Sequence, residues 1–127
     1  MRKTFRSAIA LGFAAASLVL GTVSAEARSA PPTSQGDFAG CRTGWVCIYA
    51  DASWNSRIVY QWQNYGAHNL ANMEGAHRVF NNQTGGAVAY LCLGYGASNC
   101  PGGNDVQPWE YWDTNLSPIN SVWMPAP

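Results

Sequence analysis

The residues of this chain best suited to chemistry by type and spacing are its cysteines, which form two close pairs: Cys41 with Cys47, and Cys92 with Cys100. Zinc binding is a weak interpretation, because neither pair has Cys-x2-Cys spacing and the two histidines are not one helical turn apart. Four cysteines allow three connectivities, and their grouping favours the two local bridges. We therefore expect two disulfides and no metal site.

Catalytic side chains are sparse. His68 could act as a base oriented by Asp51, and the carboxylates of Glu110 and Asp113 could act on a glycosidic bond. No Gly-x-Ser-x-Gly elbow is present, and oxidised cysteines supply no nucleophile. We expect no enzymatic activity and no cofactor.

The first 27 residues have the pattern of a signal peptide. A basic start with Arg2, Lys3 and Arg6 precedes an apolar run over residues 8–23, and Ala25-Glu26-Ala27 offers cleavage after Ala25 or Ala27. An uncleaved membrane anchor is the alternative, but a stop-transfer flank is missing. We expect a secreted, extracellular protein with a signal peptide (1–27), a flexible leader (28–40) and a folded domain (41–127), and no membrane partner after cleavage.

The charge of residues 28–127 excludes one class of partner. Four arginines face six acidic residues and there is no lysine, whereas a nucleic-acid-binding protein carries a basic stripe. The same segment is rich in Trp, Tyr, Val and Leu, which is typical of a folded domain. A domain of about ninety residues gains from covalent cross-links. We expect a monomer with no nucleic-acid partner.

The elements that must position these groups are strands. Runs of β-branched and aromatic residues alternate with Asn, Asp and Gly turns, and no helical period appears after the first 27 residues. The expected strands fall at residues 45–49, 58–62, 78–80, 87–92, 108–112 and 120–123.

The two halves of this pattern can be aligned with each other. Gly44-Trp45-Val46 corresponds to Gly86-Ala87-Val88, and Asn69-Leu70 corresponds to Asn115-Leu116. A duplication of about forty residues explains the match. Two such units predict an all-β, Greek-key β-sandwich built from two internally duplicated motifs. A single irregular barrel is the alternative.

The opening of the domain carries a family resemblance. Residues 41–54 read Cys-Arg-Thr-Gly-Trp-Val-Cys-Ile-Tyr-Ala-Asp-Ala-Ser-Trp. They resemble the C-x-x-G-x-x-C-L-Y-x-D-x-x-[FW] opening of small secreted bacterial proteins of the streptomycete metalloproteinase inhibitor family. The resemblance extends over residues 41–124 and implies a βγ-crystallin-like fold. The acidic and amide residues that bind calcium in crystallin-like domains are mostly missing before Val79 and Val122, so no calcium site is expected.

The resemblance implies that the chain inhibits a secreted peptidase, most simply a metallopeptidase. The reactive loop would then be the second cysteine loop, residues 92–100, with Cys92–Leu93 as the contact bond and Gly94 beside it. Leu93 and Tyr95 would supply apolar anchors. In the competing interpretation, residues 92–100 are only a hairpin connection closed by a disulfide, and their glycines adopt positive φ.

The six tryptophans suggest an alternative function. Trp45, Trp62 and Trp123 lie in strand runs and are expected in the core. Trp109 and Trp112 stand beside acidic residues and predict a surface aromatic patch. Such a patch would make the protein a carbohydrate-binding or cell-envelope-binding module, or an antimicrobial one.

Overall fold

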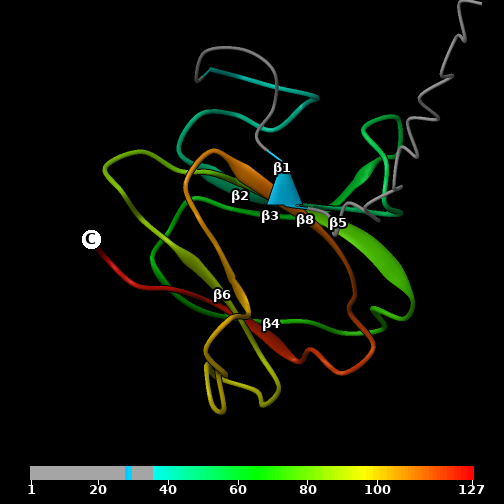
Figure 1. Ribbon diagram of the computed structural model, residues 1–127, viewed down its shortest axis with the longest axis vertical. Helices are drawn as coiled ribbons and strands as arrows, with labels where there is room; N and C mark the ends of the chain where they lie inside the picture. The colour runs from blue at the N-terminus through cyan, green and yellow to red at the C-terminus, as the bar shows by residue number, and fades with distance from the viewer. Residues whose placement is uncertain (1–27, 30–35) are drawn as a thin grey trace, which may run out of the picture.

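The structure, a computed structural model, describes residues 28–29 and 36–127; the expected signal peptide lies outside them. The described residues form strands and no helix, and the strands make two antiparallel sheets (Figure 1). The strands are β1 (Arg28–Ser29), β2 (Trp45–Tyr49), β3 (Ile58–Trp62), β4 (Gly66–Asn69), β5 (Ala76–Asn82), β6 (Ala89–Cys92), β7 (Asp105–Val106), β8 (Glu110–Asn115) and β9 (Ser121–Met124). The all-β prediction is confirmed, and two separate sheets replace the single-barrel alternative.

Each half of the chain lends one strand to the sheet of the other half. The first sheet has the order β1-β8-β5-β2-β3, and the second has the order β4-β9-β6-β7. The strand β4 of the first half therefore pairs with β9, and the strand β8 of the second half pairs with β5. Neither half completes a sheet without the other.

The main core lies between the two sheets. Its side chains are small and medium aliphatic groups with two methionines, and Val46, Ile48, Leu91 and Val122 are fully buried within it. Alternate residues of each strand face this layer because successive strand side chains point to opposite sides of a sheet. Burial of this apolar surface is the main force that holds the sheets together.

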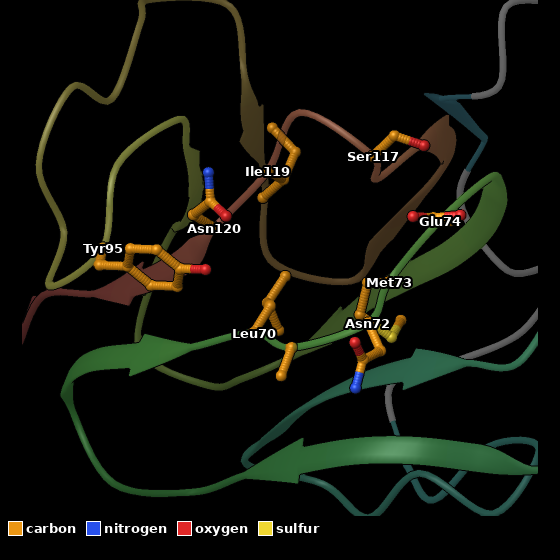
Figure 2. A pocket seen from close by; sticks show the side chains of 9 residues that line it. Leu70, Asn72, Met73, Glu74, Tyr95, Ser117, Ile119 and Asn120 are labelled. Atoms are coloured by element: carbon orange, nitrogen blue, oxygen red, sulfur yellow. The ribbon is translucent and has the colours of Figure 1, made fainter.

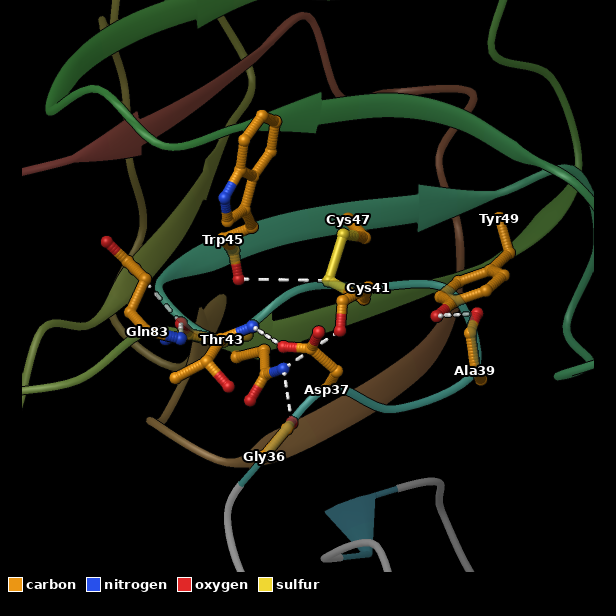
Figure 3. Close-up of a disulfide and its surroundings, with 11 residues drawn as sticks. Gly36, Asp37, Ala39, Cys41, Thr43, Trp45, Cys47, Tyr49 and Gln83 are labelled. Carbon is orange, nitrogen blue, oxygen red and sulfur yellow. Dashed lines mark hydrogen bonds between the residues drawn. A yellow bond between two sulfur atoms is a disulfide. The ribbon is translucent and has the colours of Figure 1, made fainter.

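A second, aromatic cluster covers the outer face of the first sheet. The disulfide Cys41–Cys47 lies in it, together with buried Tyr49 and Phe80. Phe38 packs edge-to-face on Trp54 and Phe80, with ring centroids 4.9 and 6.0 Å apart. Figure 3 shows the segment before Cys41 lying against β2.

Residues 28–29 and 36–40, which the sequence assigns to a flexible leader, make contacts with the folded domain. Arg28 and Ser29 form β1 and pair with β8, while Phe38 and Cys41 exchange backbone hydrogen bonds of 2.8 and 2.9 Å. The ring of Phe38 packs against the outer aromatic cluster.

Arg78 lies across this cluster from β5. Its guanidinium group lies 4.4 Å from the ring centroid of Trp54 and 4.3 Å from that of Tyr111. Nε and Nη2 donate to the two carboxylate oxygens of Asp113 at 2.7 and 2.6 Å. This hydrogen-bonded ion pair raises the pKa of Arg78. The guanidinium group of Arg78 is therefore both ion-paired with Asp113 and stacked on two aromatic rings.

Candidate functional site

The loop at residues 92–100 follows β6 and is closed by the disulfide Cys92–Cys100, whose Cα atoms lie 4.0 Å apart. The other disulfide joins Cys41 and Cys47, so both predicted bridges are confirmed and all four cysteines are paired. Two disulfides fit a protein of an oxidising, extracellular environment.

The backbone inside the loop folds back on itself. The amide of Gly94 donates to the carbonyl of Ser98 at 3.0 Å, and the Ser98 hydroxyl donates to the carbonyl of Tyr95 at 2.8 Å. Ala97 and Asn99 have φ values of 61° and 50°, in the left-handed region that side chains other than glycine rarely adopt. The surrounding contacts must hold this conformation in place.

Two side chains of the second sheet support the loop from beneath. Ser121 on β9 is fully buried, and its Oγ donates to the carbonyl of Gly94 at 2.6 Å and accepts from the amide of Ala97 at 3.0 Å. Asn69 at the end of β4 accepts from the amide of Gly96 at 2.7 Å. The loop is thus anchored at three separate backbone groups to two different strands.

The Cys92–Leu93 peptide bond, the predicted contact bond, is protected. The Cys92 carbonyl accepts from the amide of Asn120 at 2.9 Å, and the Leu93 amide donates to the carbonyl of Asn99 at 2.8 Å. Cys92 is fully buried, and the Leu93 side chain packs against the main core. The polar groups on both sides of this peptide bond are therefore occupied within the fold.

Tyr95 is the exposed large side chain of this loop. Its residue surface is 61% exposed, the largest value among the large hydrophobic residues that the structure describes. The ring forms one wall of a cavity of about 150 Å³ between residues 70–74 and 117–120. Figure 2 shows the ring beside Asn120 and Leu70, on the far side of the cavity from Glu74.

The tryptophans are arranged differently from the prediction. Trp109 packs into the outer aromatic cluster, whereas Trp112 packs against the main core, so the two do not form one surface patch. Trp112 lies in β8, whereas Trp109 precedes the strand and has a φ of 62°, in the left-handed region. Trp123, expected in the core, is 38% exposed and lies beside Tyr90 on the second sheet. Trp62 does contact the main core.

The candidate catalytic residues His68, Asp51 and Asp113 each make a contact with another part of the fold. The Nε2 atom of His68 lies 2.7 Å from the carbonyl of Asn64. Asp51 belongs to the loop after β2, where its carbonyl accepts from the amide of Arg78 at 3.1 Å. Asp113 is occupied by the Arg78 ion pair.

Neither a metal-binding group nor a membrane span is found in the part of the chain that the structure describes. No three His, Cys, Asp or Glu side chains of residues 28–29 and 36–127 come together in a way that could hold an ion. Over the same residues no helix has the length and apolar character needed to cross a bilayer.

The sequence did not reveal a groove near the end of β3. Two hollows of about 500 and 220 Å³ meet there, and Gln63 and Asn64 line both. The sequence feature that could have indicated the groove is the mixture of amides and aromatic rings in residues 61–65, Gln-Trp-Gln-Asn-Tyr. The same residues are also typical of an ordinary strand end.

Comparison with known proteins returned no match: no family model, curated protein or solved structure is similar to this chain.

Proposed function

We propose that the protein is a secreted, monomeric inhibitor of peptidases, most simply of metallopeptidases, which blocks the active-site cleft with the disulfide-closed loop at residues 92–100. Its framework would be a βγ-crystallin-like pair of Greek-key motifs. The exchange of β4 and β8 between the sheets supports this interpretation, because it gives both halves the same strand order. Secretion rests on the signal-peptide pattern, and the two disulfides fit it.

The observation that carries the proposal is a rigid loop with an exposed apolar tip. The Cys92–Cys100 bridge and the anchors from Ser121 and Asn69 hold the backbone around Tyr95. A loop that is already ordered loses little conformational entropy when it binds, so more of the contact energy appears as affinity. Tyrosine is also among the residues that most often dominate binding interfaces.

Tyr95 acts in this proposal as the anchor that fills a hydrophobic specificity pocket. The Tyr95 carbonyl accepts from the amide and hydroxyl of Ser98, and the Gly96 amide donates to Asn69. Both polar groups of the Tyr95–Gly96 bond are thus occupied, so the loop resists being threaded and cut as a substrate. Inhibition would come from side-chain anchoring and from occlusion of the cleft.

The test is a titration of a thermolysin-like metallopeptidase with the purified, oxidised protein, with subtilisin run in parallel. We expect stoichiometric, saturable loss of metallopeptidase activity. Tyr95→Ala should weaken inhibition at least tenfold, because it removes a buried aromatic anchor from the complex. Tyr65→Ala, which removes the other highly exposed tyrosine, should leave inhibition unchanged.

Three outcomes count against the proposal. Full activity of both peptidases at micromolar inhibitor would refute inhibition of these classes. Loss of subtilisin activity alone would reassign the target class. Equal inhibition by the wild type and Tyr95→Ala would show that the loop is not the contact surface.

A further inference from the structure

The groove beside β3 is formed where the chain passes from the first sheet to the second. Trp45, at the start of β2, and Gln61 line the smaller hollow, and Tyr65 lines the larger one. Gln63 and Asn64 belong to both hollows. The two hollows therefore share two amide side chains, and Trp45 and Trp62 line the smaller hollow while Tyr65 lines the larger one.

The polar groups of the groove are available to a ligand. Gln61, Gln63 and Asn64 are exposed, and their side-chain amides make no hydrogen bond to another described residue. Each amide offers two donor hydrogens and an acceptor oxygen. Tyr65 is 51% exposed, so much of its ring can also be covered by a ligand.

The groove contains no strongly charged side chain. No Lys, Arg, Asp or Glu contributes to the lining of either hollow. A polyanion such as a nucleic acid or an acidic polysaccharide needs cationic contacts, and these are missing from the lining. An uncharged ligand with many hydroxyl groups fits the lining better.

The turn that carries these amides is held in a fixed shape. The Nε2 atom of His68 lies 2.7 Å from the carbonyl of Asn64, which ties β4 back to the turn. The imidazole stacks on Trp62 with ring centroids 4.8 Å apart, and Trp62 stacks in turn on Tyr60 at 5.2 Å. The groove is consequently preorganised, which reduces the entropy lost on binding.

We propose that this groove binds a neutral oligosaccharide. Pyranose rings present an apolar C–H face that lies on aromatic side chains, here Trp45 and Tyr65, and hydroxyl groups that exchange hydrogen bonds with the amides of Gln63 and Asn64. The larger hollow, of about 500 Å³, lies within the usual range of small-ligand sites, about 300–1,000 Å³.

This site is separate from the inhibitory loop, since it shares no residue with residues 92–100. The alternative function predicted from Trp109 and Trp112 thus has a different location. Saccharide binding can therefore be tested independently of peptidase inhibition.

The test is calorimetric titration of the purified, oxidised protein with hexasaccharides of β-1,4-linked glucose, N-acetylglucosamine and xylose. We expect binding of at least one of them at concentrations up to about 1 mM. Tyr65→Ala should weaken that binding at least tenfold, and Gln63→Ala at least threefold. Tyr95→Ala is the matched control, because it removes a tyrosine of similar exposure outside the groove and should leave saccharide affinity unchanged.

Both alternatives to the proposal are measured in the same series. Absence of binding to all three hexasaccharides would overturn it. So would binding that Tyr65→Ala and Gln63→Ala leave intact, since the site would then lie elsewhere. Binding of casein-derived peptides, weakened by Tyr65→Ala while no saccharide binds, would reassign the groove to peptides. A circular dichroism spectrum for each variant confirms that the fold is retained.

Discussion

Replacing Ser121 with alanine should loosen the 92–100 loop without altering any exposed side chain. Its buried Oγ donates to the carbonyl of Gly94 and accepts from the amide of Ala97, at 2.6 and 3.0 Å. Each hydrogen bond contributes about 1 kcal/mol, so the loss of both lowers the free energy of unfolding by about 2 kcal/mol.

Urea unfolding, followed by tryptophan fluorescence, measures this change. For a small domain the dependence of the free energy of unfolding on urea is about 1–3 kcal/mol per molar, so the midpoint should fall by about 0.7–2 M. Ser117→Ala is the matched control, because Ser117 also accepts from a backbone amide, that of Gly75 at 3.0 Å, but is exposed. Water can replace that hydrogen bond, so Ser117→Ala should change the free energy of unfolding by no more than about 0.5 kcal/mol.

Hydrogen exchange localises the effect. The amide of Ala97 should exchange faster in Ser121→Ala than in the wild type, because its acceptor is gone. If both serine variants shift the urea midpoint equally, or if the Ala97 amide exchanges at its wild-type rate, Ser121 does not anchor the loop. Where the peptidase proposal holds, the same variant should also inhibit less well with Tyr95 unchanged.

Three further perturbations test the outer cluster and the loop closure. Burial raises the pKa of Tyr49 to about 12 from an ordinary value of 10.0. The protein should therefore lose up to about 3 kcal/mol of its free energy of unfolding between pH 10 and 12, and none of it below pH 10. In urea unfolding, Tyr49→Phe should not show this pH dependence. Arg78→Lys removes the bidentate ion pair with Asp113 and the stacking on two aromatic rings. Thermal unfolding should show that the free energy of unfolding falls by about 1–3 kcal/mol. The control Arg57→Lys, at an exposed position, should leave it unchanged. Replacing Cys92 and Cys100 with serine removes a disulfide that joins residues eight positions apart. The free energy of unfolding, measured by urea titration, should fall by about 2–3 kcal/mol. An unchanged urea midpoint would contradict the loop-closure account.

Strands with strong local patterns were predictable, and strands imposed by partners were not. The predicted ranges 45–49 and 58–62 coincide with β2 and β3, whose aromatic and β-branched residues favour extended backbone. The strand β4 reads Gly-Ala-His-Asn, which has no β propensity. Pairing with β9 creates it, and pairing between distant segments leaves no local signal.

The disulfide that closes the candidate loop was predictable, but the contacts around the loop were not. The spacing of Cys92 and Cys100 predicted both the bridge and the loop. It could not show that Asn120 occupies the polar groups around Leu93, because these contacts join segments 27 residues apart. Likewise, the separation of Trp109 from Trp112 became visible only with the two hydrophobic clusters.

The exchange of β4 and β8 has a consequence for how the chain folds. The strand β5 reaches its neighbour β8 only after residues 110–115 exist, and β4 must wait for β9 at residues 121–124. Sheets that depend on such distant pairings form slowly, since a long chain loop must close before any contact is gained. Both disulfides close short local loops and so cannot bring the halves together early. A nascent chain ending at Asn82 would carry β4 without its partner β9, and β5 paired with β2 on one edge only. Such open strand edges can pair with other chains.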